Sequence, residues 1–491
     1  MQEKLQFTPE NIEALFGNEA AEDENQTRLR AYYFKSSIYT QIVTDLPVRI
    51  LVGHKGIGKS ALFKVAIAEE EEEGRLSVLI RPNDIIDLKI NTSDFLDTIR
   101  VWTEGLNKII AKKSLEIIGA EPKNVSAKSE DYPIKIIDFI ENGFKELLST
   151  SKYNLSQKKF VEKFLETKKV SVYIDDLDRG WQGRQEDIHR LSALLNAVRD
   201  ISSENNRSIC FKVALRSDVY YLVRTSDEST DKIEGSVIWH TWTNHEIFVL
   251  LIKRIETFLG RKVEESELLK IGQRQLADKY LNSIMELQFR GTGKWENAPM
   301  YRVLMSLIRK RPRDLVKLCT LAAKEAFNRK SSIIQTKDFQ AIFEEYSQGR
   351  IQDTINEYRS ELPEIEQLVL NMKPNRKERT TSQGYVYKSD ELLKKIENIQ
   401  ASRGSFRFSN GRTAEKQELA AFLYKINFLT ARKESSQGEI IRKYFEENRY
   451  LKSKFVDFGF DWEIHPAYRW ALQPDTIDDI FKMLELSADE E

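Results

Sequence analysis

One glycine-rich loop carries the residue types and spacing with the clearest chemistry in this sequence. It follows an apolar run at residues 48–52 and precedes a helical pattern at residues 61–66. Glycines let backbone N–H groups turn inward around phosphate oxygens, a lysine reaches the terminal phosphates, and a hydroxyl ligates Mg²⁺. Strand, loop and helix come in the order that a phosphate-binding loop requires. The alternative is a glycine-rich turn that arose by chance, and such a turn would not need a strand before it and a helix after it. The predicted phosphate-binding residues are Gly53, His54, Lys55, Gly56, Ile57, Gly58, Lys59, Ser60 and Ala61.

The residues of this loop have different expected roles. Lys59 supplies the positive charge for the terminal phosphates of a nucleoside triphosphate, and Ser60 is a predicted Mg²⁺ ligand. His54 and Lys55 are expected to line the mouth of the loop without taking part in the chemistry.

Paired acids follow a second apolar run, at residues 170–174. A carboxylate at the end of a strand near the loop strand can hold Mg²⁺, and a second acid beside it can polarise the attacking water. We therefore predict that Asp175 serves the metal and that Asp176 is catalytic. The alternative is that these acids only cap the helix that begins near Gln185, because aspartate is favoured at such positions.

Length and composition are those of a soluble globular protein. The 491 residues are enough for about two to four domains. The 76 basic and 77 acidic side chains leave a formal charge of −1, so no global attraction to nucleic acid or to a membrane is expected. No run is apolar enough to span a bilayer and no signal-peptide core is visible, so we expect a cytoplasmic protein without a membrane partner. Cys210 and Cys319 are expected to be buried, reduced thiols, and the histidine spacing predicts no zinc site.

The pattern of apolar runs predicts an α/β fold with a parallel sheet and several helical segments. A helix is expected at residues 27–44, and the long helical stretch before residue 170 exceeds what one crossover needs, so it indicates an insertion. Beyond the helix expected at residues 245–259, the strand pattern ends. The strands expected in the sheet are residues 48–52, 76–80, 170–174, 208–215 and 236–240.

The carboxyl end of the fourth predicted strand carries Arg216, Ser217 and Asp218. Ligands bind at the carboxyl ends of such parallel strands, so we expect these residues to face the nucleotide. A hydroxyl at this position is also a common helix cap, which is the alternative for Ser217.

The order of strands, phosphate loop, paired acids and following helices resembles the additional-strand P-loop ATPases. Asp175-Asp176-Leu177-Asp178-Arg179 and Arg311-Pro312-Arg313-Asp314-Leu315 look like the KAP, STAND and origin-recognition (AAA+) branches of that group. The similarity covers residues 27–345. It implies ATP and Mg²⁺ as cofactors and a helical lid after the sheet.

By this resemblance, Ser217 senses the γ-phosphate and Arg313 is a second sensor that reaches over the phosphates from a lid helix. Arg313 could instead pair with Asp314 or Glu325 on a solvated helical face. The family often has glutamate at the position of Asp176, so hydrolysis is expected to be slow. No arginine finger stands out within the chain, which predicts that a neighbouring copy supplies one and that the protein forms a homo-oligomer. The candidates are Arg179 and Arg224.

The C-terminal part predicts helices followed by a small hairpin, in which residues 428–433 pair with residues 455–458, and this order resembles a winged helix. Its basic residues are interleaved with acids, so regulatory packing is a stronger expectation than DNA binding. In the STAND branch a late histidine holds the β-phosphate of ADP, and His465 has a similar position. The alternative is a histidine that is hydrogen-bonded within its own domain.

The resemblance implies an ATP-dependent molecular switch that regulates assembly or a separate effector protein, in bacterial antiphage defence. One alternative is a DNA-binding AAA+-type ATPase that regulates replication or transposition, and another is a nucleotide-binding scaffold without hydrolysis. The expected domains are an N-terminal helical segment at 1–46, an ATPase core at 47–243 with a helical insertion at about 92–168, a helical lid at 244–348 and a winged-helix-like domain at 349–491.

Overall fold

The computed structural model divides the chain into two compact units. The first unit holds residues 1–34, 56–58 and 241–491, and the second holds residues 35–55 and 59–240. The structure describes all residues except 1–4, 19–20, 89, 91–93, 118–135, 150–160, 163, 206–207, 227, 376–377, 379–383, 435–439, 449–458, 474–479, 481–483 and 488–491.

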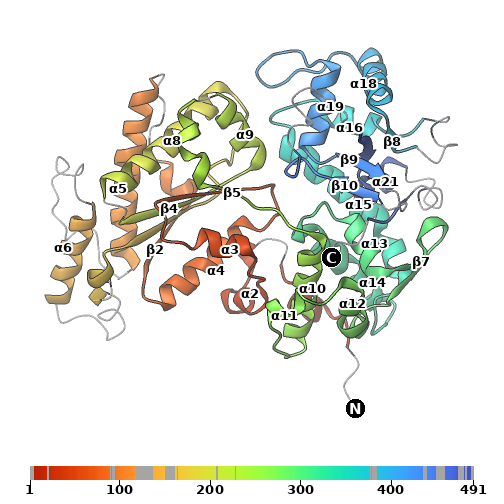
Figure 1. Ribbon diagram of the computed structural model, residues 1–491, viewed down its shortest axis with the longest axis horizontal. Helices are drawn as coiled ribbons and strands as arrows, with labels where there is room; N and C mark the ends of the chain where they lie inside the picture. The colour runs from red at the N-terminus through yellow and green to blue at the C-terminus, as the bar shows by residue number, and fades with distance from the viewer. Residues whose placement is uncertain are drawn as a thin grey trace. The chain divides into compact units, whose positions relative to one another are not determined.

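The second unit is built on a parallel sheet (Figure 1). Its five strands lie in the order β2-β3-β4-β1-β5, and every neighbouring pair is parallel. Strand β4 therefore separates the strand before the glycine-rich loop from the strand before the paired acids, which is the arrangement of an additional-strand P-loop core. The predicted α/β fold is confirmed. The strands are β1 (Val48–Val52), β2 (Leu76–Ile80), β3 (Val170–Ile174), β4 (Ile209–Leu215) and β5 (Val237–Trp239).

Helices cover both faces of this sheet. Successive side chains of a strand point to opposite faces, so neighbouring residues of β3 contact helices on different sides of the sheet. Val172 of β3 packs in one hydrophobic cluster with Trp102 of α5 and Leu194 of α8. The next residue, Tyr173, places its ring 5.0 Å from the ring of Phe63 on α4. Helices α5 and α8 thus lie on one face and α4 on the other (Figure 1). The helices are α3 (Ser37–Ile42), α4 (Lys59–Glu72), η2 (Pro82–Ile85), α5 (Phe95–Ile117), α6 (Ile136–Ser149), α8 (Gln185–Glu204), α9 (Ser217–Ser226) and η4 (Glu228–Ser236).

The helix predicted at residues 27–44 is wrong as a single element. The structure has α2 (Gln26–Tyr32) and α3, with Tyr33 and Ser36 in extended conformation between them. The extended segment buries Phe34 completely, beside Trp242, in the core of the first unit. The chain leaves the first unit after Phe34, so tertiary burial overrides the helical pattern there.

The first unit begins with α1 and continues after the sheet with a group of helices. Thr8 caps α1 with its side chain, as its sequence position before proline indicates. The expected end of the strand pattern after residue 259 is wrong, because β6 and β7 form an antiparallel hairpin. The elements of this part are α1 (Pro9–Phe16), η1 (Ala21–Asp23), α10 (Asn244–Phe258), α11 (Glu265–Leu268), α12 (Gln273–Tyr280), η5 (Leu281–Ser283), β6 (Gln288–Arg290), η6 (Gly293–Trp295), β7 (Glu296–Pro299), α13 (Met300–Leu307), α14 (Pro312–Asn328) and α15 (Thr336–Tyr358).

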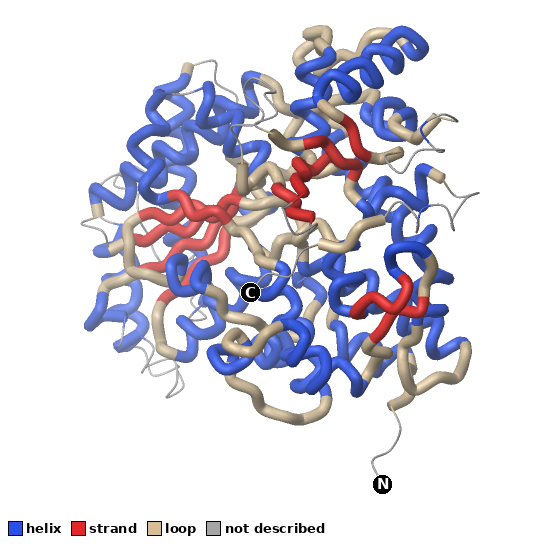
Figure 2. The backbone as a smooth tube through the Cα atoms, turned by 45° about the vertical axis from the view of Figure 1, so that its right-hand side comes forward, coloured by secondary structure: helices blue, strands red, loops and turns tan. Residues whose placement is uncertain are grey.

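The C-terminal part combines helices with a four-stranded antiparallel sheet in the order β10-β9-β11-β8 (Figure 2). Residues 455–458, the predicted partner of the first hairpin strand, lie outside the described residues. Strand β9 pairs with β10 and β11. Helix α15 continues through the boundary expected between residues 348 and 349. The elements are α16 (Ile365–Asn371), β8 (Val386–Tyr387), α18 (Ser389–Arg403), α19 (Lys416–Lys425), β9 (Leu429–Glu434), β10 (Ile440–Lys443), β11 (Asp461–Ile464), η7 (Pro466–Tyr468) and α21 (Arg469–Leu472).

Candidate nucleotide site

The glycine-rich loop joins β1 to the first turn of α4. Gly56 and Gly58 have φ angles of +79° and +109°, which residues with side chains rarely adopt. Lys59 and Ser60 are the first residues of α4, a helix of 14 residues. The unsatisfied N–H groups and the dipole of a helix N-terminus attract anions. The loop therefore has the backbone geometry that phosphate binding needs.

Lys59 lies across this loop. Its Nζ donates to the carbonyl oxygens of Gly53, at 2.7 Å, and His54, at 3.1 Å. Lys55, by contrast, is exposed. The two lysines of the loop therefore differ, because Lys59 is hydrogen-bonded to backbone carbonyls of the loop and Lys55 is exposed.

The acids predicted after β3 lie in three different environments. Asp175 is 6% exposed, and its backbone N–H donates to the carbonyl of Ile80 at 3.0 Å. Asp176 is exposed and has a φ of +62°, a left-handed conformation that aspartate tolerates better than most residues. Asp178 is buried, and its carboxylate accepts the backbone N–H of Arg216 at 3.0 Å. The acids therefore do not share one position.

Asp178 is a residue to which the sequence reasoning assigned no role. Burial raises its pKa above the usual value, against the opposing charges of Arg216 and Lys59. Its carboxylate thus lies within the electrostatic range of the loop lysine and ties the end of β4 to the segment after β3. The signal in the sequence was its place three residues after Asp175 in the same motif.

The end of β4 also reaches the loop. The Ser217 hydroxyl lies 3.2 Å from Nδ1 of His54, and both side chains are buried. Arg216 instead directs its guanidinium to Asp218, with an Nη2–Oδ2 distance of 2.7 Å. Of the three residues predicted to face the nucleotide from this strand, the structure brings Ser217 to the loop, while Arg216 and Asp218 pair with each other.

His240 is a second residue of this region that the sequence reasoning did not single out. It follows β5, and its backbone N–H donates to the carbonyl of Val52 at 2.7 Å. Burial, with the charge of Lys59 adding to it, lowers its pKa to about 3. A neutral imidazole therefore lies near the loop lysine. Its place at the carboxyl end of a strand was the available signal.

The tip of the loop, residues 56–58, belongs to the first unit. A methyl group at Gly56 would lie 3.3 Å from both Cβ and Cδ of Arg313. The Trp242 indole donates to the carbonyl of Ile57 at 2.8 Å, and Ile57 is buried. Arg313, at the start of α14, thus packs directly on a glycine of the loop.

His465 lies in the environment named above as its alternative. It is fully buried, its Nδ1 accepts the backbone N–H of Ala467 at 3.1 Å, and its Nε2 lies 2.9 Å from the hydroxyl of Tyr444. Burial lowers its pKa to about 3, with the charges of Arg442 and Arg309 acting in the same direction. A phosphate contact would have to replace one of these two hydrogen bonds.

Helix α19 would be the groove-entering helix of a DNA-binding winged helix. Residues 419–425 of this helix are buried, and only its first turn is accessible. Buried Lys425 pairs with Glu361, and Phe422 packs against Tyr358 of α15. In this structure α19 packs within its own unit and presents no basic face.

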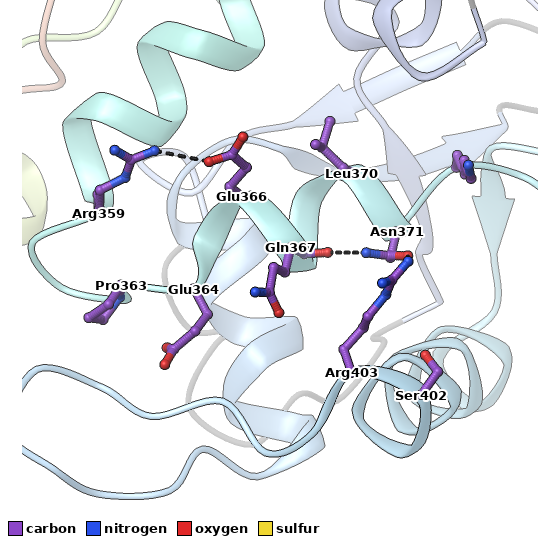
Figure 3. Close-up of a pocket in the computed structure, with 10 residues that line it drawn as sticks. Arg359, Pro363, Glu364, Glu366, Gln367, Leu370, Asn371, Ser402 and Arg403 are labelled. Carbon is purple, nitrogen blue, oxygen red and sulfur yellow. Dashed lines mark hydrogen bonds and ion pairs between the residues drawn. The ribbon is translucent and has the colours of Figure 1, made fainter.

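A separate polar pocket of about 980 Å³ lies between the end of α15, α16 and the end of α18 (Figure 3). Arg359 pairs with Glu366 at 3.0 Å, and the Arg403 guanidinium donates to Asn371 at 3.2 Å. None of the predicted site residues lines this pocket.

The residues around the loop fit a nucleotide with Mg²⁺. Lys59 would hold the terminal phosphates, while Ser60 and Asp175 would hold the ion, which supplies charge neutralisation to the phosphates. Within the part of the chain that the structure describes, no group of three His, Cys, Asp or Glu side chains could hold a metal by itself. No described helix is long and apolar enough to cross a membrane. Both cysteines, Cys210 and Cys319, are buried, as expected, and neither is part of a disulfide bond.

Comparison with known proteins finds a family domain within the chain and a distant relative that matches most of the chain. The domain described as a FunZ-associated C-terminal helical domain matches residues 282–355, which include α13, α14 and most of α15. A protein of Escherichia coli that is named after transposon gamma-delta and a mass of 80.3 kDa is 23% identical over 527 residues, covering 95% of this chain and 69% of that protein.

Among solved structures, a Walker-type ATPase of Pyrococcus abyssi is similar with a TM-score of 0.41 and 11% identity, over 90% of this chain and 96% of that one. The ORC2 protein of Aeropyrum pernix, solved in ADPNP–ADP complexes, has a TM-score of 0.40 and 11% identity, over 89% and 88%. At these TM-scores the two structures carry no weight for the function. The strand order of this chain and its glycine-rich loop are similar to those of P-loop folds.

Proposed function

We propose that the protein is an ATP-binding, slowly hydrolysing molecular switch whose nucleotide state regulates its assembly or a separate effector protein. The observation that carries this proposal is the convergence at the carboxyl edge of the parallel sheet. Lys59 spans the loop after β1, Asp175 follows β3, and Ser217 follows β4 within hydrogen-bond distance of His54. These are the parts that a P-loop ATPase needs for phosphate and Mg²⁺.

In this proposal each residue has one role. Lys59 binds the terminal phosphates, Asp176 polarises the attacking water, and Ser217 senses the γ-phosphate through its place beside the loop. Arg313 is the second sensor, supported by its contact with Gly56. Aspartate is shorter than the glutamate common in the family, so Asp176 supports slow turnover, as a switch requires.

The biological context has two candidates. The resemblance of the motifs supports regulation of a separate effector in bacterial antiphage defence. The Escherichia coli relative is named as a transposon gamma-delta protein, and this similarity favours a DNA-associated ATPase that regulates transposition as the second candidate. Because α19 is buried, its face supports regulatory packing over DNA reading. Salt-dependent binding of the protein to duplex DNA would favour the second candidate.

Calorimetric titration with ATP tests the nucleotide site. Lys59→Ala should lose affinity by at least about 30-fold, because truncating one partner of a buried charge contact leaves the other without compensation. Lys55→Ala is the comparison variant, since this lysine is exposed at the mouth of the same loop, and it should lose much less affinity than Lys59→Ala. Unchanged ATP affinity in Lys59→Ala would refute the assignment of the loop.

Hydrolysis is tested in the same preparations. Asp176→Asn should retain ATP binding and lose turnover by about 10²-fold or more, because the amide cannot accept the proton of the attacking water. Asp176→Glu is the matched variant and should retain turnover. Equal turnover in Asp176→Asn and wild type removes this residue from catalysis, and ATP that survives prolonged incubation with stoichiometric wild type indicates a scaffold without hydrolysis.

A further inference from the structure

A buried cluster of charged side chains is centred on the residue that follows Arg313, the predicted sensor. Asp314, which follows Arg313 on α14, is 1% exposed. Its carboxylate accepts four N–H groups: the backbone N–H, Nε and Nη2 of Arg309 at 3.2, 2.7 and 2.9 Å, and Nη1 of Arg350 at 2.7 Å. Burial alone would raise the pKa of Asp314, but the Arg309 and Arg350 charges outweigh it and hold the pKa well below its usual value. Asp314 therefore stays ionised and anchors the first turn of α14.

The same arginine reaches the C-terminal part of the unit. Nη1 of Arg309 donates to the hydroxyl of Tyr468 at 2.9 Å and to Oγ1 of Thr354 at 3.1 Å. Its guanidinium also lies 5.5 Å from the centre of the Tyr468 ring. Tyr468 is fully buried and ends η7, the turn that directly follows β11. Arg309 thus joins α14, α15 and the C-terminal sheet in one contiguous set of contacts.

A second contact runs parallel to this one. Lys310, which follows Arg309, pairs with Glu447 at 2.8 Å and lies 5.5 Å from the ring centre of Tyr444. The loop between α13 and α14 is therefore held to the C-terminal part at two successive residues. A shift of the sheet cannot leave this loop unchanged, because the buried guanidinium of Arg309 would lose its hydrogen bond to Tyr468, and an unsatisfied buried polar group is destabilising.

We infer that Tyr468 is a positioning residue for the nucleotide site, because it acts through Arg309 and Asp314 to hold Arg313 against Gly56. This inference rests on the proposed function of the loop and extends it to the regulation of that site. By linkage, a nucleotide that prefers one position of Arg313 also prefers one arrangement of Tyr468 and the sheet around β11. The C-terminal sheet is then the element that reads the nucleotide state.

The choice of Tyr468 gives a mild and specific test. Tyr468→Phe keeps the ring and removes only the hydroxyl, and Thr354 remains as an acceptor for Arg309. Tyr424→Phe is the matched control, because Tyr424 is equally buried in the same part of the chain and its hydroxyl donates to the carbonyl of Tyr444 at 3.0 Å. Neither substitution touches the loop or the acids of the site.

The experiment measures kcat and KM for ATP in wild type, Tyr468→Phe, Arg313→Ala, the double variant and Tyr424→Phe. Tyr468→Phe should lower kcat/KM by about fivefold, a usual size for coupling between sites. In the Arg313→Ala background, Tyr468→Phe should change kcat/KM by less than about twofold, since the residue through which Tyr468 acts is then absent. Tyr424→Phe should match wild type.

An equal fold-change with and without Arg313 overturns the inference, and so does an equal loss in Tyr424→Phe, because both indicate a general effect on folding. Hydrogen exchange without nucleotide supplies an independent readout. Tyr468→Phe should speed exchange at residues 311–316, and Tyr424→Phe should not. Unchanged exchange there in Tyr468→Phe overturns the positioning role. Wild-type protein that binds no ATP refutes the proposed function instead, while the exchange measurement still decides the link.

Discussion

At the scale of single residues, buried histidines show how burial changes what a side chain can do. Because Nδ1 of His465 accepts the N–H of Ala467, the ring carries its proton on Nε2, next to the hydroxyl of Tyr444. A second proton would sit on Nδ1 and face another N–H group. His465 is therefore held neutral, and an imidazole in this state serves the stability of the sheet.

This predicts loss of stability in acid. The folded pKa of His465 is about 3 and its ordinary value is 6.5, so the unfolded chain takes up a proton that the folded chain excludes. The contribution of neutral His465 to the free energy of unfolding is present above pH 6.5 and is lost as the pH falls toward 3. Between pH 6.5 and about 5 the loss should be about 1–2 kcal/mol. Urea unfolding at the two pH values measures it.

The His465→Asn variant keeps an acceptor for Ala467 and cannot take up the proton, so its pH dependence should be weaker than that of wild type by this amount. His189→Asn, at an exposed position of α8, is the control and should keep the wild-type dependence. If His465→Asn and wild type lose equal stability in acid, His465 is not the titrating group.

At the scale of elements, the glycine-rich loop depends on two separate properties of Gly56. Its φ of +79° is a left-handed backbone conformation, and its missing Cβ leaves room for Arg313 at the start of α14. Gly411, in the loop between α18 and α19, has a similar φ of +82° with nothing within 4 Å of an added Cβ. Gly411 therefore reports what left-handed strain alone costs in stability at a position outside the phosphate loop.

Substitution of each glycine by alanine therefore tests the contact. Both Gly56→Ala and Gly411→Ala should lose about 1–2 kcal/mol of stability, because alanine is strained in the left-handed region. Only Gly56→Ala should also weaken ATP binding, since strain at this position distorts the phosphate loop and its methyl group displaces Arg313. Thermal unfolding and ATP titration of both variants measure the two effects. Equal ATP affinity in both variants would show that the contact with Arg313 does not matter for the nucleotide.

At the scale of the whole molecule, the structure distinguishes the two candidates for an arginine that acts on a neighbouring copy. Arg224 is paired with Glu234 at 2.6 Å. Arg179 is exposed, directly after the acids that follow β3, and forms no ion pair with any residue that the structure describes. Arg179 is thus the better candidate for a residue that completes the site of another copy.

We expect ATP to promote self-association, because an arginine from a second copy would contact the terminal phosphate. Light scattering should give a higher mass with ATP than with ADP or without nucleotide. A mixture of Arg179→Ala and Asp176→Asn, each inactive alone, should regain part of the turnover, since one shared site then has both wild-type residues. Arg224→Ala should remain active. The same mass in all nucleotide states, or no recovery on mixing, would contradict this prediction.

Sequence pattern alone was enough for the features that depend on local contacts. The five strands, the loop before Lys59 and the acids after β3 could be predicted, because period, glycine spacing and strand ends are local properties. The helices that precede β3 and those that follow β5 could be expected from the same pattern. The break before α3 was missed, because the extended segment is stabilised by burial of Phe34 in the core of the first unit, and this burial is not visible in the local sequence pattern.

Tertiary structure decided which residues meet. The strand order β2-β3-β4-β1-β5 brings Ser217 to His54, although 162 residues lie between them (217 − 54 − 1). Packing alone directs His465 into its own sheet and makes Tyr468 the residue bonded to Arg309. The sequence by itself determined which residues form the glycine-rich loop and which acids are paired. Within each motif these residues are neighbours along the chain, so the covalent backbone fixes their spacing. Only the tertiary structure determined the contact of Arg313 with Gly56, the pairing of Asp314 with Arg350 and the hydrogen bond of Tyr468 to Arg309, because these residues belong to elements that are distant along the chain.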